Sequence, residues 1–373
     1  MQKKLIAVAV LGACVAGSAF AANVDVYGRI DTGLSYVHEK IGDQAGTDKL
    51  SMDSGLSSGN RWGLKGSEDL GNGYQVGFVL ESGFSSDTGA IGEEGKLFNR
   101  EATLRVSGPF GSIYAGRMGR IGSDAGSVGF YAGSVSPFGS GWGKMAGHFA
   151  VTANYDTRYS NALAYVSPKV GPVTVYAQYT MGNATENESG DDRLFSLGAQ
   201  ADFGALQVLG LVEYLNKQST VAGTNDAPNV THNDSQYDDS YTINLGGSYD
   251  FGVAKVFLAG QYFNAAPTFA GKGGDWTESF DGFGVNVGAS APIGAGEFLV
   301  SAGYGKGDYH VGTKDTNRSA DSYIFQVGYT YPFSKRTNLY AGAGYHQTTM
   351  EEEVGEDSKT KTTQVMFGLL HKF

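Results

Sequence analysis

The chain ends on the stretch TQVMFGLLHKF, residues 363–373, and its last residue is aromatic. Apolar side chains occupy every second position along most of this stretch, with glutamine, glycine and lysine between them. Successive side chains of a β-strand point to opposite faces, so the alternation predicts a strand with one apolar face that runs to the carboxyl terminus. Met366 and Leu370 interrupt the pattern, because they place apolar groups on the other face. The alternating positions are Val365, Phe367, Leu369 and, after His371, Phe373.

Three further segments alternate in the same way, GFGVNVGASA (282–291), YIFQVGYTY (323–331) and YQVGFVLES (74–82). In each of them, apolar or aromatic residues share one face, and glycine or polar residues occupy most of the other. The sustained 3.6-residue periodicity of amphipathic helices is not found after residue 21. The sequence, with 57 glycines, 22 tyrosines and 21 phenylalanines, therefore predicts an all-β protein.

The connections between these segments fall into two lengths. Short ones read LGNG (70–73), GPFG (108–111) and PIGAG (292–296), whereas long polar stretches lie, for example, near 38–59 and 307–320. Short turns at one end and long loops at the other are typical of a transmembrane antiparallel β-barrel, and their spacing predicts about sixteen strands. A soluble sandwich would alternate similarly, but uninterrupted hairpins and a secretion signal favour the barrel.

The amino terminus has the layout of a secretory signal peptide. Two lysines precede an apolar run from Leu5 to Val15, which is too short to span a bilayer, and AFA (19–21) offers a small-residue cleavage site. We therefore expect residues 1–21 to be removed and 22–373 to form the barrel, with the formal charge moving from −11 to −13 as two lysines are lost. The single cysteine, Cys14, lies within the signal, so no disulfide is expected; LGAC, ending on it, also fits a lipoprotein processing site.

One connection differs from the rest. From about residue 118 to about 155 the chain is rich in glycine and serine and shows no strand pattern. Loops of this length without regular structure are usually functional. In a wide barrel we expect this third long connection to fold into the lumen and narrow it.

Several ordered motifs resemble those of trimeric general porins of Gram-negative outer membranes, of the neisserial and related type. The motifs are NRWGLKGSEDLGNGYQVGFVLESGF (60–84), NREATLRVSGPFGSIYAGR (99–117), YPFSKRTNLYAGAGY (331–345) and the final HKF. The resemblance implies a sixteen-stranded barrel that assembles as a homotrimer among outer-membrane lipid and lipopolysaccharide. It also implies an inward third loop that forms an eyelet, and passive diffusion of ions, notably small anions, and small hydrophilic solutes. The terminal Phe373 resembles the signal that the outer-membrane assembly machinery recognises.

Strand alternation directs a set of charged side chains into the lumen. In NRWGLKG, for example, the basic residues oppose Trp62 and Leu64. Rings of charge around a constriction select ions by sign. The residues directed inward are Arg29, Asp31, Arg61, Lys65, Glu81 and Arg158.

The resemblance adds roles to some of these residues. It matches Arg61, Arg100 and Arg158 to the wall arginines that face the eyelet, and Glu81 to their acidic partner. Arg100 conflicts with strand parity, because Ala102 on its face looks outward. A bulge, or a position above the lipid, would reconcile the two interpretations. These arginines could also be simply solvated lumen residues.

The charge pattern favours a weak anion preference. The third connection itself carries few charges, chiefly Asp124 against Arg120 and Lys144. The acids cluster in presumed outer loops, for example Glu351–Glu353, beyond a Debye length of about 8 Å from the eyelet. We therefore expect the local basic field to outweigh the negative net charge.

Other functions remain open at this level. Aromatic residues in the third connection, such as Phe130 and Trp142, are compatible with a substrate-specific channel, and a barrel without a channel could be an adhesin or a hydrolase. The sequence offers no catalytic constellation: GLSSG (55–59) matches a nucleophile-elbow pattern outside the strand–turn–helix context it needs, and the six histidines lack zinc spacing. We expect no enzyme activity, cofactor, metal or nucleic-acid partner.

Overall fold

The computed structural model describes ten ranges of the chain, and the expected signal peptide, residues 1–21, lies outside them. The ranges are 23–143, 151–181, 193–216, 220–221, 230–231, 238–270, 272–273, 278–311, 314–351 and 357–373. Within these ranges no helix is long and apolar enough to cross a membrane.

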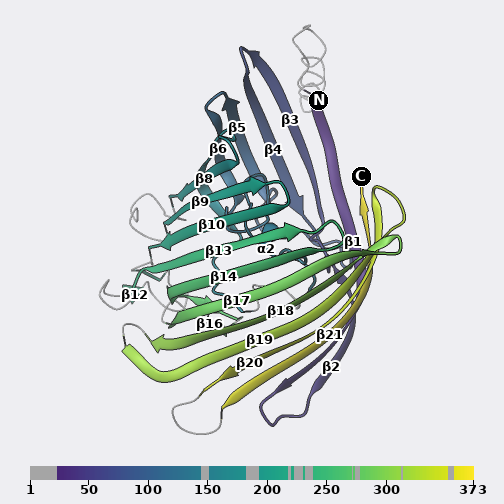
Figure 1. Cartoon of the computed structure of the whole chain (residues 1–373), viewed down its shortest axis with the longest axis vertical. Helices are drawn as coiled ribbons and strands as arrows, with labels where there is room; N and C mark the ends of the chain where they lie inside the picture. The colour runs from purple at the N-terminus through teal and green to yellow at the C-terminus, as the bar shows by residue number, and fades with distance from the viewer. Residues whose placement is uncertain are drawn as a thin grey trace, which may run out of the picture.

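The described chain forms a closed antiparallel barrel (Figure 1). Its seventeen main strands occupy sixteen places, because β2 and β3 both pair with β1 and share one place. The barrel closes where β1 pairs with β21, from Arg29 opposite Lys372 to Ile41 opposite Thr360. The prediction of about sixteen antiparallel strands is confirmed.

The strands of the barrel are bounded as follows: β1 Asn23–Ile41, β2 Thr47–Ser54, β3 Arg61–Gly71, β4 Tyr74–Gly83, β5 Glu101–Gly108, β6 Gly111–Gly119, β7 Arg158–Val166, β8 Val173–Thr180, β9 Leu194–Phe203, β10 Leu206–Leu215, β13 Ser240–Asp250, β14 Lys255–Ala266, β17 Glu278–Ile293, β18 Gly296–Val311, β19 Lys314–Pro332, β20 Thr337–Met350 and β21 Ser358–Lys372. Two small hairpins lie outside this sheet, and one short helix, α2, is found in the third connection. They are β11 Thr220–Val221 with β12 Val230–Thr231, β15 Thr268–Phe269 with β16 Lys272–Gly273, and α2 Ala132–Val135.

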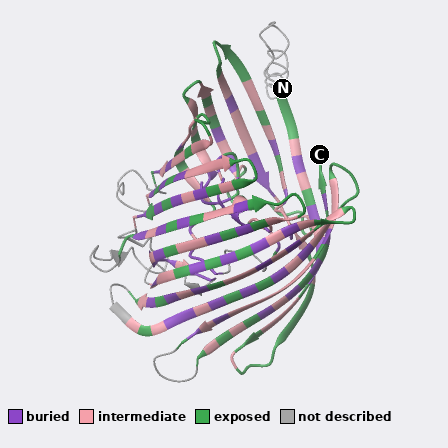
Figure 2. Ribbon diagram, viewed as in Figure 1, coloured by how far each residue is buried: buried purple, intermediate pink, exposed green. Residues whose placement is uncertain are grey.

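Burial alternates along the strands, as Figure 2 shows by its banded colours. On β21 the outward Phe367 is 51% exposed, whereas the inward Gln364 is 3% exposed. The two interruptions of the terminal pattern have a physical reason. Met366 and Leu370 face inward and are buried in a cluster with Phe138 of the third connection.

Some strands run further than the sequence predicted. The polar stretch near 38–59 is not one outer loop, because β1 continues to Ile41 and β2 occupies Thr47–Ser54. The stretch near 307–320 likewise belongs largely to β18 and β19. Strand pairing here continues through residues with little apolar alternation, so an argument from apolar faces ended these strands too early.

The third connection runs from the end of β6 at Gly119 to the start of β7 at Arg158, and includes α2. Its described parts pack against residues of the inward face of the wall. The Phe130 ring stacks on Tyr176 of β8 with centroids 4.1 Å apart. The packing needs glycine in the wall: a Cβ added at Gly198 would come within 2.6 Å of the Phe130 ring.

The last residue, Phe373, extends the pairing of β1 with β21 that closes the barrel, which we call the seam. Phe373 donates its N–H to the carbonyl of Gly28 at 3.1 Å and accepts the N–H of Gly28 at 3.2 Å. A sheet edge left open in lipid would expose unpaired backbone groups. Deletion of Phe373 is therefore expected to lower the amount of assembled barrel in the outer membrane several-fold. Unheated gel electrophoresis of outer-membrane fractions measures this, because folded barrels migrate differently from unfolded chains.

The matched control is deletion of Asp87, an exposed residue between β4 and β5. That variant removes one residue without touching the seam. Equal amounts of assembled barrel in the two deletion variants would contradict the role given to Phe373.

Candidate functional site

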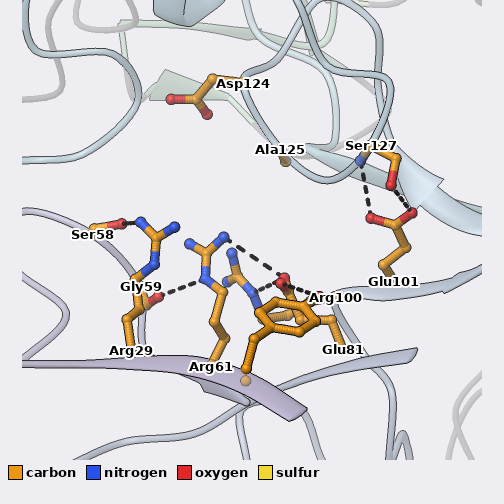
Figure 3. A network of polar contacts seen from close by, with 12 residues as sticks. Arg29, Ser58, Gly59, Arg61, Glu81, Arg100, Glu101, Asp124, Ala125 and Ser127 are labelled. Carbon is orange, nitrogen blue, oxygen red and sulfur yellow. Dashed lines mark hydrogen bonds and ion pairs between the residues drawn. The ribbon is translucent and has the colours of Figure 1, made fainter. Parts of the chain in front are cut away.

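Five arginines line one cavity of about 460 Å³; four of them lie on or next to strands of the wall, and the fifth, Arg120, lies in the third connection. Arg29 lies on β1, Arg61 begins β3, Arg158 begins β7, and Arg100 directly precedes β5. Figure 3 shows Arg29, Arg61 and Arg100 next to one another, with Asp124 of the third connection across from them. The structure thus brings together residues that are up to 129 positions apart in the sequence.

Glu81 of β4 is the acidic partner of two of these arginines. Its Oε1 accepts a hydrogen bond from Arg100 Nε at 2.8 Å and lies 3.7 Å from Arg61 Nη1. Its Oε2 accepts a hydrogen bond from the Tyr27 hydroxyl at 3.0 Å. Glu81 is only 5% exposed, so both its oxygens are satisfied within the wall.

Neutral acceptors orient Arg29 and Arg158, and they also orient Arg61. Arg29 Nη1 donates to the hydroxyl of Ser58 at 2.6 Å, and Arg61 Nε donates to the carbonyl of Gly59 at 3.0 Å. Arg158 Nε donates to the carbonyl of Arg100 at 3.0 Å. Hydrogen bonds to uncharged oxygens fix these side chains without supplying a negative charge; Arg61 has the nearby carboxylate of Glu81 in addition.

The parity conflict at Arg100 has a simple structural origin. Strand β5 begins at Glu101, so Arg100 lies just outside the pleat that would direct it outward. Its backbone N–H donates to the carbonyl of Glu81 at 3.2 Å, and this contact keeps it beside the acid.

Two wall carboxylates that we did not single out from the sequence bind the third connection. Glu101 accepts hydrogen bonds from the N–H of Ser127 at 3.0 Å and from its hydroxyl at 2.5 Å. Glu213 of β10 accepts a hydrogen bond from Arg120 and another, at 3.1 Å, from Ser196. The alternation of Glu101 with Thr103 on β5 could have revealed the inward position of Glu101.

The predicted charges of the third connection have different environments. Arg120 is 5% exposed and its charge is matched by the buried Glu213. Asp124 lines the arginine cavity, and its carboxylate accepts the N–H of Ser140 at 3.0 Å and the Ser140 hydroxyl. Lys144 lies outside the described residues.

Lys65 is not part of the arginine cavity. It lines a second cavity of about 560 Å³, together with Asp25 and Arg105. Its ammonium group lies 5.3 Å from the centre of the Tyr27 ring.

A third cavity, of about 300 Å³, adjoins the arginine cavity through Arg158. Glu93, in the long connection between β4 and β5, lies 3.2 Å from Arg117 Nη2 here. A hydrogen bond from Lys96, aided by the charge of Arg117, lowers the pKa of Glu93. Glu93 therefore remains ionised at neutral pH, and its charge is matched by Lys96 and Arg117.

The aromatic side chains in the described part of the third connection are mostly covered. Phe130, Tyr131, Phe138 and Trp142 are between 3% and 8% exposed. Such burial matches a role in packing the connection onto the wall and leaves little aromatic surface for a sliding solute.

Among the residues that the structure describes, no group of three or more His, Cys, Asp or Glu side chains is arranged to hold a metal ion. The hydroxyl of Ser57, in the motif GLSSG, donates a hydrogen bond to the Asp31 carboxylate at 2.9 Å. The motif lies in a turn between β2 and β3 and lacks the strand–turn–helix setting of a nucleophile elbow.

A comparison with protein families matches residues 7–350 to a family described as Gram-negative porin. The chain is 34% identical to an outer membrane porin protein of Bordetella pertussis, with all of both chains covered. It is 30% identical to the major outer membrane protein P.IB of Neisseria meningitidis, over 34% of this chain and 37% of that protein.

Solved structures show the same architecture. The anion-selective porin from Comamonas acidovorans superimposes with a TM-score of 0.64 at 23% identity, covering 94% of this chain and 100% of that one. OmpT of Vibrio cholerae, in a trimer form, superimposes with a TM-score of 0.59 at 16% identity, covering 93% of this chain and 99% of that one.

Proposed function

Since the chain belongs to the Gram-negative porin family and forms a channel in the bacterial outer membrane, we propose that this channel prefers anions and that the arginine cavity sets the preference. Members of this family are channels rather than enzymes, so the property to explain is the passage of solutes through a pore. The observation that carries the proposal is the lining of the cavity, in which four arginines face one aspartate, Asp124, once Arg120 is set aside as paired with Glu213.

The positions of the charges matter more than their sum. Asp31, Glu81 and Glu101 are buried in the wall at 0%, 5% and 2% exposure, and none of these three carboxylates lines the cavity, whereas the four wall arginines do. At an effective dielectric constant of about 20, a unit charge contributes ~4 kcal/mol at 4 Å and ~2 kcal/mol at 8 Å, before screening and desolvation. An ion in the cavity therefore interacts more strongly with the nearer arginines than with the carboxylates behind them.

We further propose that the third connection narrows the channel at this level. Its support is the set of contacts that tie the connection to the inward face: Ser127 to Glu101, Arg120 to Glu213, and Ile121 N–H to Gln178 at 3.0 Å. These contacts come from three different strands, β5, β10 and β8. These strands belong to one arc of the wall, and Trp142 near the other end of the connection packs against Tyr340 of β20, with ring centroids 5.5 Å apart. A segment tied to both parts of the wall restricts the space between them.

Porin homologues include trimeric forms, and we infer that this chain also assembles as a homotrimer. The unheated gel assay used for the Phe373 deletion reports the oligomer directly. We expect the outer-membrane assembly machinery, lipid and lipopolysaccharide to be its other partners.

The test of the preference is the zero-current potential of the full-length mature protein in a planar bilayer with a KCl gradient. We expect the sign that indicates chloride preference, with a small magnitude because Glu81 and Asp124 offset part of the basic field. A potential of the opposite sign would overturn the proposal. Flux of sugars or organic anions that rises linearly with concentration is expected as well, whereas saturation would favour a substrate-specific channel.

A further inference from the structure

The strand pairing beside β1 is interrupted where β2 gives way to β3. Pairing of β1 with β2 ends at Thr32 opposite Ser54, and pairing of β1 with β3 begins at Arg29 opposite Arg61. Two residues of β1, Ile30 and Asp31, therefore lie opposite six residues, 55–60, of the segment that links β2 to β3. The surplus cannot lie in the wall, and it forms what we call the inward turn, residues 55–60, three of which line the arginine cavity.

A single buried carboxylate holds the inward turn. Asp31 Oδ2 accepts hydrogen bonds from Ser57 N–H at 2.9 Å, from the Ser57 hydroxyl at 2.9 Å and from Ser58 N–H at 2.7 Å. Asp31 Oδ1 accepts the hydroxyl of Tyr340 from β20. Asp31 is fully buried, and an ionised carboxylate is the side chain that offers only acceptors to several converging donors.

The backbone of Asp31 continues the same arrangement. Its carbonyl accepts Gly55 N–H at 2.8 Å, and its N–H donates to the side-chain oxygen of Asn60 at 2.5 Å. The first and the last residue of the inward turn are thus tied to the same residue of β1. Asp31 therefore contacts the inward turn at both ends through its backbone and in the middle through its carboxylate.

The inward turn contacts both the wall arginines and the third connection, which together form the proposed constriction. Its Ser58 hydroxyl and Gly59 carbonyl accept the hydrogen bonds of Arg29 and Arg61. On its other side, the carbonyl of Leu56 accepts Gly143 N–H of the third connection at 2.8 Å. The Leu56 side chain belongs to the buried cluster that contains Phe138 and Trp142.

We propose that Asp31 is a positioning residue for ion selectivity, acting through the inward turn on the wall arginines and on the end of the third connection. This inference rests on the proposed function, since it assigns Asp31 to the same constriction. Both oxygens of its carboxylate are occupied by hydrogen bonds from the turn and from Tyr340. Through these contacts Asp31 sets where the arginines stand.

The substitution Asp31→Asn separates position from charge. It keeps the size of the side chain, removes one negative charge and replaces an acceptor with an NH₂ donor that opposes the donors already present. If Asp31 acted through its charge alone, the variant would show higher anion preference with unchanged conductance. Positioning predicts the reverse: lower anion preference, higher conductance and a noisier open state, measured in planar bilayers.

Limited proteolysis of the folded barrel provides a second readout that charge alone would not change. We expect the third connection to be cleaved about tenfold faster or more in Asp31→Asn, the factor that corresponds to one lost charge-assisted hydrogen bond. Tyr340→Phe, which changes no charge, is expected to shift all readouts in the same direction by less. It also keeps the proposal testable if Asp31→Asn fails to fold.

Asp25→Asn is the matched control. Asp25 lies on β1, pairs with Lys65 across the strands and lines the second cavity, away from the inward turn. This variant removes the same charge and is expected to raise anion preference without faster cleavage. The proposal is overturned if Asp31→Asn behaves like the Asp25→Asn control and Tyr340→Phe behaves like the wild type. Faster cleavage together with wild-type conductance and selectivity would support the role of Asp31 in holding the inward turn and would instead overturn the proposed constriction.

Discussion

Excision of residues 122–143 is expected to yield a folded barrel whose single-channel conductance is several-fold higher than that of the wild type. The excised segment carries Phe130 and Trp142, which anchor the third connection to the wall, together with Asp124. The strand pairings of the barrel do not pass through it. Ion flow through a water-filled pore rises with its narrowest cross-section, so removal of a segment that we propose restricts the lumen is expected to increase the current.

The excision begins beyond the buried pair of Arg120 and Glu213, and both charges therefore keep their partner. This matters because a buried carboxylate left without its cation costs several kcal/mol. Deletion of residues 217–238, the same length from another long connection, is the control and is expected to change conductance little. A folded excision variant that conducts like the wild type would show that the third connection does not form the narrowest part.

Strand parity predicted much of the barrel, because the two-residue period of a strand does not depend on what surrounds it. It placed Phe367 outward and Gln364 inward without any knowledge of the partners of β21. It did not predict β2, whose apolar Leu50 and Met52 alternate over only eight residues before the glycine- and serine-rich turn. In that composition the strand and the turn resemble one outer loop, and the inward turn was missed with them.

The site was predictable only in part, for a related reason. Parity found Arg29, Arg61 and Arg158, since each lies within or at the start of a strand. Their partners come from closure of the barrel: 309 positions separate Tyr340 from Asp31, and 93 separate Glu213 from Arg120. No local pattern links residues so far apart.

Arg61 and Arg158, which strand parity directs into the lumen, are the positions at which a change of charge is most informative. Replacement of Arg61 and Arg158 by glutamate is expected to reverse the ion preference from anions to cations. Each substitution changes the charge at the cavity by two units, and at an effective dielectric constant of about 20 a unit charge at 8 Å is worth ~2 kcal/mol before screening. Even a remainder of ~1.4 kcal/mol corresponds to a factor of ten in an equilibrium constant, so the zero-current potential in a KCl gradient should change sign.

Arg61 lies beside Glu81, and a glutamate there brings two like charges together, so the unheated gel assay must first show that the double variant still forms barrels. The control neutralises Glu351–Glu353, of which Glu352 and Glu353 lie outside the described residues. These acids are expected to matter little, because salt screens charges in the outer loops over about 8 Å. If the loop acids controlled the potential and the arginine pair did not, the selectivity would arise at the channel mouth. The buried position of Glu81 and the neutral acceptors of Arg61 and Arg158 would then serve only to stabilise the wall.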